Sequence, residues 1–266
     1  MKGTLKKFIL FFSLPVLFQS HPNFSAVYSQ RGYILSQNII QDNNPENKID
    51  LKDQEENIEK ALIYFNNREY RANFKLFYAI PIKFATAVTK SSIFQDTGII
   101  RLEIKSLFHH EIESCINIRT GKPLWHKWKM SSIFGKKDIS AYFDNERGLI
   151  EYTKNDTKKT LSFCRQVYDP LSAMVSCFSR KIKKGKMEEG MLDMNILWYI
   201  GKIYPVTIDI KKEKDKFKVG IASNKKSSGY ALFDENGRPL GGEGYAVPLA
   251  GHVSIYDKEF ENKLKK

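Results

Sequence analysis

Asp169-Pro-Leu-Ser-Ala-Met-Val-Ser-Cys-Phe-Ser-Arg180 decides the fold, because it is the one clear amphipathic helix in a chain that otherwise alternates as β-sheet does. The Asp169 carboxylate can accept from the free N–H groups of a first helical turn, and Pro170 suits the first helical position. Apolar residues then recur at helical spacing, namely Leu171, Met174, Val175, Phe178 and Ile182. Basic residues from Arg180 onward favour the helix end, and Gly185 predicts the stop.

This helix has two interpretations, which differ in what its apolar face covers. In both interpretations, Asp169, Pro170 and Ser172 have a structural role as the residues that begin the helix. The apolar face either seals a core or roofs a pocket, and we expect a pocket. Its lining would then comprise Leu171, Met174, Val175 and Phe178. Arg180 would either hold a carboxylate or backbone carbonyls, or face an anionic ligand in that pocket.

The chain around the helix alternates between apolar and polar residues from Tyr70 onward. Ile100, Leu102 and Ile104 alternate with charged residues, as a half-buried antiparallel strand requires. About ten such short strands are expected. The pattern predicts a mainly β fold, a curved antiparallel sheet or half-open β-barrel with one covering α-helix. By analogy of architecture alone, this fold is similar to the envelope carriers of lipid and lipoprotein.

The N-terminus predicts export. Residues 1–7 carry three lysines and no acid, and residues 8–18 are mostly apolar but too short to span a bilayer. We expect a signal peptide over 1–29, with an uncleaved anchor as the alternative, and a periplasmic location with no later transmembrane span. A polar flexible linker over 30–64, a single β-rich domain over 65–257 and a charged tail over 258–266 would follow. A short helix at 57–65 could mark the entrance to the domain.

The charge favours anionic partners. Lys and Arg total 43 against 30 Asp and Glu, for a net charge of +13. Lipid headgroups, cell-wall polymers and nucleic acid are all anionic. The lysines are spread along the chain, as on an ordinary solvated surface. Residues 180–186 are basic, but expected export and aromatics on the core face argue against nucleic acid.

Several short motifs, in order, carry a resemblance. They are Ile118-Arg-Thr-Gly121 with Pro123, Phe143-Asp144 with Gly148 and Tyr152, Asp169-Pro-Leu-Ser172 followed by Arg180, Gly201-Lys202 with Tyr204, and Pro248 with Gly251-His-Val253. Over residues 70–256 the chain resembles the exported bacterial proteins of the domain of unknown function 3108 family (DUF3108). The resemblance implies an exported, sheet-rich domain without assigned chemistry.

Metal-ligand residues are densest at His109-His110-Glu111, with Glu113 beyond. On a strand, His109, Glu111 and Glu113 would share one face, and His126 could add a ligand from another strand. No zinc spacing or helical two-histidine motif is present, so we interpret the group as an exposed turn and strand. We expect no metal and no other cofactor.

Catalytic motifs are weak. Ser172 and Cys164 are the candidate nucleophiles, with His252 or His126 as base, but no Gly-x-Ser-x-Gly elbow occurs. The glycines of residues 241–244 predict a flexible hairpin rather than a phosphate loop. Cys164 and Cys177 either pair as a disulfide or stay free.

The sequence therefore favours a non-catalytic envelope module that binds a hydrophobic ligand such as a lipid or an acyl chain. The alternative is an envelope assembly or protein-interaction domain whose core is filled and which binds an envelope protein. A hydrolase that uses Ser172, or a metal at His109, is the third hypothesis.

Overall fold

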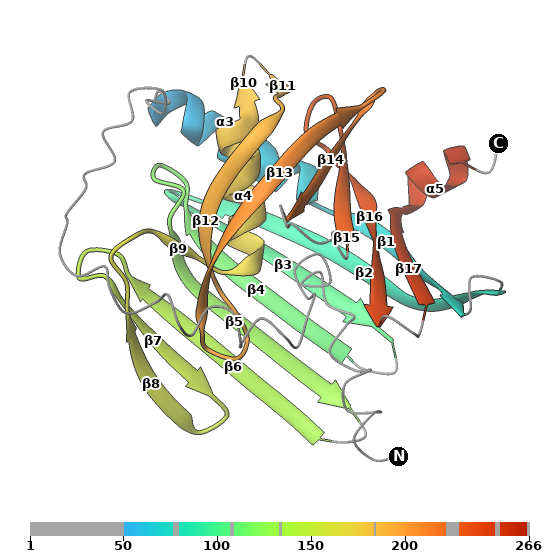
Figure 1. Ribbon diagram of the computed structural model, residues 1–266. Coiled ribbons are helices and arrows are strands. Elements are labelled where there is room, and N and C mark those ends of the chain that lie inside the picture. The colour runs from blue at the N-terminus through green and yellow to red at the C-terminus, as the bar shows by residue number, and fades with distance from the viewer. Residues whose placement is uncertain are drawn as a thin grey trace, which may run out of the picture.

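One large, curved sheet surrounds two packed helices in the computed structural model (Figure 1). The structure describes residues 51–76, 80–106, 109–132, 135–183, 185–221, 229–247 and 251–264 of the 266 residues. The expected signal peptide and residues 30–50 of the expected linker lie outside the described residues.

The sheet consists of two antiparallel meanders that are joined edge to edge. The first meander contains β1 (Arg68–Leu76), β2 (Ile80–Phe94), β3 (Thr97–Lys105), β4 (His109–Asn117), β5 (Pro123–Ser132), β6 (Gly135–Asp144), β7 (Leu149–Lys154) and β8 (Thr157–Ser162). The second contains β12 (Gly190–Leu197), β13 (Ile203–Glu213), β14 (Lys216–Ile221), β15 (Gly229–Asp234), β16 (Pro239–Val247) and β17 (Gly251–Asp257). β17 pairs with β1, and the short β9 (Val167–Tyr168) pairs in parallel with β12 at the far end.

Side-chain alternation orients this sheet as the sequence predicted. On β3, Ile100, Leu102 and Ile104 are buried, whereas Arg101 and Lys105 are exposed. Successive residues of a strand point to opposite faces, so one face of β3 lies in the core and the other in solvent. The mainly β prediction is confirmed in this coarse form.

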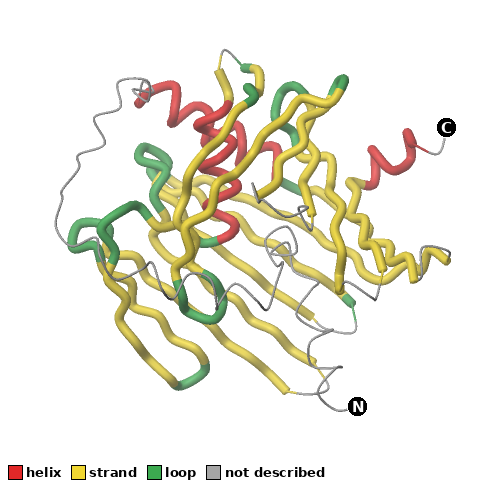
Figure 2. The backbone as a smooth tube through the Cα atoms, in the orientation of Figure 1, coloured by secondary structure: helices red, strands yellow, loops and turns green. Residues whose placement is uncertain are grey.

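Three helices accompany the sheet in the described part of the chain (red in Figure 2). They are α3 (Leu51–Phe65), α4 (Pro170–Lys181) and α5 (Lys258–Leu264). α3 contacts α4, β2 and β3, whereas α4 contacts β4 of the first meander, β12 of the second and the short β9. α4 therefore lies between the two halves of the sheet, as Figure 1 shows.

α4 is more buried than an amphipathic surface helix. Eight of its twelve residues are buried, including Ser172, Ser176 and Ser179, which lie outside the apolar stripe of the helix. Small residues at these positions let neighbouring elements approach closely, so the helix is covered on several sides. The helix ends at Lys181 with Ile182 as its C-cap. Gly185, the predicted stop, instead lies in the turn between β10 (Ile182–Lys183) and β11 (Lys186–Met187).

Two further predictions need correction. The large sheet has fifteen strands in the described part of the chain rather than about ten, and it is not closed into a barrel. The linker prediction fails from Leu51 onward, because α3 buries Ile58, Ala61 and Leu62 in the core. Within the predicted charged tail, residues 258–264 form the helix α5.

The glycine run at residues 241–244 lies inside β16 and is not a flexible hairpin. A Cβ atom on Gly241 would overlap the backbone oxygen of Ile255, and Gly241 has a φ of +143°. A Cβ on Gly242 would crowd the backbone oxygen of Tyr230. The glycines therefore serve close strand pairing, a use that sequence spacing does not distinguish from a loop.

The turn between β12 and β13 fastens the second meander onto the first. The Tyr152 hydroxyl on β7 donates to the Tyr199 carbonyl at 2.5 Å. Lys159 on β8 donates to the Gly201 carbonyl at 2.6 Å. The Trp128 ring meets the Tyr199 ring edge-on, with centroids 5.3 Å apart. Among the described residues, no strand of the second meander pairs with β7 or β8. Side chains therefore hold the two halves together at this place.

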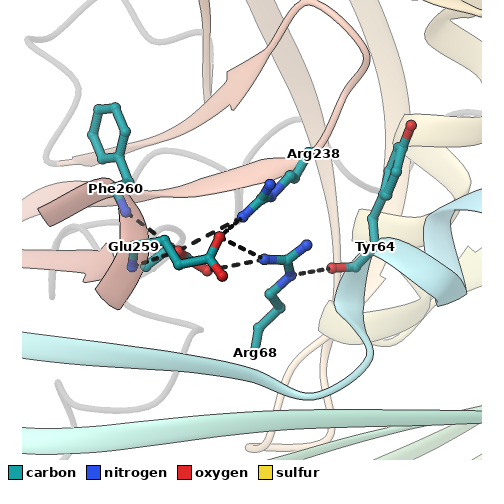
Figure 3. Close-up of polar contacts among 6 residues, drawn as sticks. Tyr64, Arg68, Arg238, Glu259 and Phe260 are labelled. Carbon is teal, nitrogen blue, oxygen red and sulfur yellow. Dashed lines mark hydrogen bonds and ion pairs between the residues drawn. The ribbon is translucent and has the colours of Figure 1, made fainter. Parts of the chain in front are cut away.

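A charged cluster stabilises the junction of β1 and β17 (Figure 3). Arg68 donates to the Tyr64 carbonyl at 3.2 Å and lies 3.5 Å from Glu259, which Arg238 contacts at 2.5 Å. The buried Asp257 accepts from the backbone N–H of Glu259 at 3.0 Å, at the start of α5. These contacts join α3, the β15–β16 turn and α5, and we interpret the cluster as structural.

Candidate functional site

The start of α4 is a buried and densely hydrogen-bonded site. Asp169 is the N-cap, and its Oδ1 accepts from the backbone N–H of Leu171 at 3.0 Å and of Ser172 at 3.2 Å. The Ser172 hydroxyl accepts in return from the Asp169 N–H at 3.0 Å. This reciprocal capping box satisfies the first N–H groups of the helix. Pro170 takes the first helical position.

Two side chains from the first meander complete this site, which we call the cap cluster: Ser114, His126, Asp169 and Ser172. Ser114 on β4 donates to Asp169 Oδ1, and its Oγ lies 3.1 Å from His126 Nδ1 on β5. His126 Nδ1 also lies 3.2 Å from Asp169 Oδ1. Register places Ser114 directly opposite His126, so the sheet presents both to the helix.

The electrostatics of the cap cluster favour an ionised Asp169. Complete burial by itself raises the pKa of this carboxyl, but the charge and hydrogen bond of His126 and the hydroxyls of Ser114 and Ser172 outweigh burial. The net result is a lowered pKa. An ionised Asp169 can only accept, so we place a proton on His126 Nδ1.

The cap cluster contains the residue types of a catalytic triad but not its geometry. In a triad, the acid contacts Nδ1 of the histidine and the nucleophile contacts Nε2. Here Ser114 and Asp169 both contact His126 Nδ1. Among the described residues, the Ser172 hydroxyl forms hydrogen bonds with the backbone of Asp169 and not with the imidazole. The imidazole therefore cannot pass a proton from either serine to Asp169 through its two nitrogens.

The predicted roof residues of α4 separate into two groups. Leu171, Val175 and Phe178 are buried in the core. Met174 lines an apolar hollow of about 30 Å³ with Ala173 and Cys177. The opposite wall is formed by residues of β13, β14 and β15: Ile208, Val219, Gly220, Ala231 and Phe233. This volume suits one or two water-sized molecules and not an acyl chain.

Arg180 has a protein partner. Its Nη2 donates to the Tyr168 hydroxyl at 2.8 Å, and its guanidinium lies 5.7 Å from the centre of the Tyr168 ring. Neither Arg180 nor Tyr168 lines the hollow beneath α4. The contact links the end of α4 to β9.

A second buried histidine lies on the same inner face as the cap cluster. His110 Nδ1 accepts from Trp128 Nε1 at 3.2 Å, and the two rings stack with centroids 5.9 Å apart. Burial lowers the pKa of His110 to about 4, with the neighbouring His109 as a smaller cause. Because Nδ1 accepts, the neutral ring carries its proton on Nε2. This atom is buried, with no hydrogen-bond partner in the described residues.

His110 should make stability depend on pH. An unfolded histidine binds a proton near pH 6.5, whereas the folded His110 resists protonation down to about pH 4. The unfolded state therefore holds more protons between these values, and the folded state loses stability as pH falls. Urea denaturation should show a loss of up to about 3 kcal/mol over this interval. His110→Asn, which keeps an acceptor for Trp128, should flatten that dependence; an unchanged slope would contradict the assignment.

The other candidate residues are dispersed. Cys115, Cys164 and Cys177 are free, so no bond joins Cys164 to Cys177. Cys164 is exposed, and burial raises the pKa of the Cys177 thiol to about 12. The side chain of His252 lies outside the described residues. Glu113 pairs with Arg101 instead of converging with His109.

Sequence reasoning missed the partners that α4 receives from distant segments. Ser114 is one, and the alternation of β4 gives only its inward orientation. Asn57 is another, because its side-chain amide donates to the carbonyls of Ser179 at 3.2 Å and Ile182 at 3.0 Å. An asparagine on the inner face of a helix was the available signal.

Comparisons with known proteins leave the family open. No family model matches the chain, and no curated protein matches it. A solved structure of a DUF1089 family protein from Pseudomonas aeruginosa shares 11% identity, with a TM-score of 0.37, over 58% of this chain and 87% of that one. This likeness is too low to carry an argument. None of the described helices is both long and apolar enough to cross a membrane.

Proposed function

We propose that the protein is a non-catalytic module of the cell envelope that acts through its surface and whose interior is filled by its own helix. The burial of α4 carries this proposal: Leu171, Val175 and Phe178 belong to the core that both meanders share. The helix occupies the position beneath the sheet where a carrier would hold its ligand. Within the described part of the chain, a hollow beside Met174 has a volume of about 30 Å³.

The cap cluster supports the non-catalytic part of the proposal. Ser114 and Asp169 approach the same nitrogen of His126, as a structural hydrogen-bond network requires and a proton relay does not. Asp169 joins α4 to Ser114 of β4 and His126 of β5, and Ser172 completes the cap of the helix. Their chemistry is explained by helix capping and by satisfaction of buried polar groups.

The partner that this proposal implies is anionic. The chain carries a net charge of +13, and exposed cations occur on the outer face of the first meander, such as Lys105 and Lys129. Headgroups and cell-wall polymers of an envelope supply the complementary charge. The envelope location rests on the apolar run at residues 8–18, outside the described residues.

A hydrophobic-ligand carrier is the second candidate, and the hollow beneath α4 favours it. The hollow is apolar, and Met174 is a flexible side chain that could move aside. A ligand larger than one or two waters would require displacement of α4 or of the strands opposite.

Native mass spectrometry and ligand uptake test the proposal. Protein purified without detergent should have the mass of the polypeptide alone and should show no saturable uptake of a fluorescent fatty acid. It should also cosediment with vesicles that contain anionic lipid, less so as salt is added, and not with zwitterionic vesicles. Saturable uptake of the fatty acid would overturn the proposal of a filled module. Failure to bind any anionic envelope component would overturn the proposal that the module acts through its surface.

Ala231→Val distinguishes the two candidates, because it adds two methyl groups to the wall of the hollow. For a filled module, the free energy of unfolding should change by no more than about 1 kcal/mol and uptake should stay absent. For a carrier, uptake by the parent protein should be strongly reduced in the variant. Thr160→Val on the exposed β8 is the matched control for adding a valine to a strand.

A further inference from the structure

Two glutamates face each other on the outer surface of the first meander. Register pairs Glu103 on β3 with Glu111 on β4, and the adjacent pair is Lys105 with His109. Like charges directly opposite on antiparallel strands destabilise the pair. Lys105 compensates Glu103 from 3.1 Å, and the surrounding side chains show where a further positive charge would lie.

The His109 imidazole lies between the two carboxylates. Its Nε2 is 3.4 Å from an oxygen of Glu103 and 3.3 Å from an oxygen of Glu111. The Nε2 atom is shielded from solvent, yet it makes no hydrogen bond within the described residues. A charge-assisted N–H···O bond would measure about 2.7–2.9 Å, so these contacts are too long for a hydrogen-bonded ion pair.

The separations suit ligands of one metal ion. A tetrahedral zinc ion with nitrogen and oxygen ligands at about 2.0–2.2 Å sets its ligands about 3.3–3.6 Å apart. Both measured separations from His109 Nε2 fall in that interval. All three ligand atoms lie within 4.8 Å of one another. Side-chain exposures of 43% for His109 and 53% for Glu111 place the three ligands at the protein surface.

We propose that Glu103, His109 and Glu111 bind one divalent cation of the zinc class. The imidazole and the two carboxylates supply three ligands, and the fourth position is open to water or to a donor from a partner. The ion neutralises the opposed glutamates and satisfies the orphaned Nε2. This site is on the outer face, apart from the cap cluster, and is independent of the proposed function.

Neighbouring charges define the controls. Lys105 Nζ lies 3.1 Å from the Glu103 oxygen and competes with an ion for it. Glu113, on the same strand and face as Glu111, is paired with Arg101 and is not a ligand. The sequence suggested His109, Glu111 and Glu113 as a group; cross-strand register replaces Glu113 with Glu103.

Zinc titration of the chelator-treated full chain tests the proposal, in a Cys164→Ser background that removes the exposed thiol. Calorimetry should give one saturable equivalent of Zn²⁺. His109→Ala and Glu111→Gln should each weaken binding at least about tenfold. Lys105→Met should strengthen binding severalfold, and Glu113→Gln should leave it within about twofold of the parent. Thermal unfolding without metal checks that each variant remains folded.

Histidine NMR provides the second measurement, because it identifies the imidazole that binds. Sub-stoichiometric Zn²⁺ should shift the ring signals of His109 and leave those of the buried His126 unchanged. No binding by the parent, equal binding by folded His109→Ala, or an equal loss in Glu113→Gln would each overturn the site.

Discussion

Asp169→Ala should lower the free energy of unfolding by about 3–5 kcal/mol, because it removes the acceptor on which the buried cap cluster depends. The substitution leaves the N–H groups of Leu171 and Ser172 without their cap. It also leaves the Ser114 hydroxyl and the His126 Nδ1 buried without their carboxylate. Urea denaturation at neutral pH measures the loss.

The pH dependence of this loss identifies its origin. The pKa of Asp169 is lowered in the folded protein from its ordinary value of 3.8. The ionised carboxylate therefore contributes stability that is present above pH 3.8 and is lost as pH falls through the folded pKa. The difference between the parent and Asp169→Ala should shrink in that acidic range. If the stability difference did not change with pH, the loss in Asp169→Ala would come from packing alone.

Two further variants provide stability changes with which the effect of Asp169→Ala can be compared. Asp138→Asn removes an exposed carboxylate on β6 and should change stability by less than about 0.5 kcal/mol. Ser114→Ala removes one donor and should cost about 1–2 kcal/mol. If Asp169→Ala cost no more than Asp138→Asn, the cap cluster would not contribute to stability.

Local chemistry in the sequence predicts the start of α4 but not the partners it meets. Asp169, Pro170 and Ser172 are adjacent, so a capping motif follows from spacing alone. Ser114 lies 55 residues before Asp169, and their contact depends on how β4 is registered under the helix. Asn57 reaches Ser179 across 122 residues. Such contacts are properties of the assembled sheet, which no local pattern specifies.

The same limit explains the errors in fold prediction. The alternation of apolar and polar residues predicts which side chains of β3 point into the core, because that strand is half buried. It does not show that β17 joins β1 and so makes one sheet of both meanders. Nor does it show that the serine face of α4 is covered, because small residues occur on exposed helix faces as well as in close packing.

The candidate metal site is likewise only partly predictable from local sequence. His109 and Glu111 are separated by one residue on a strand, so their shared face is predictable. Glu103 joins them only through the β3–β4 pairing, and Glu113 leaves the group because Arg101 is its cross-strand partner. Cross-strand register therefore decides which residues form the site.

Phe178→Ala should cost about 3–5 kcal/mol, because it empties the point where three elements meet. The Phe178 side chain is 2% exposed, and its ring packs edge-on against Tyr64 of α3 at a centroid distance of 5.8 Å. It also fills the space beside Gly237, where a Cβ atom would overlap the ring. Ile63→Ala, at a position 64% exposed on α3, is the control and should stay within about 0.5 kcal/mol.

A double-mutant cycle with Gly237 determines whether α4 is a fixed core helix or a movable roof. Gly237→Ala should destabilise the parent through overlap with Phe178 and through its φ of +80°. Without the ring the φ cost and a close contact with Ile182 Cδ1 remain, so Gly237→Ala should cost about 1–2 kcal/mol less in Phe178→Ala. Additive effects, with Phe178→Ala costing under about 1 kcal/mol, would mean that α4 packs loosely. A loosely packed helix could open over a ligand, and the hydrophobic-carrier function would then replace the filled module.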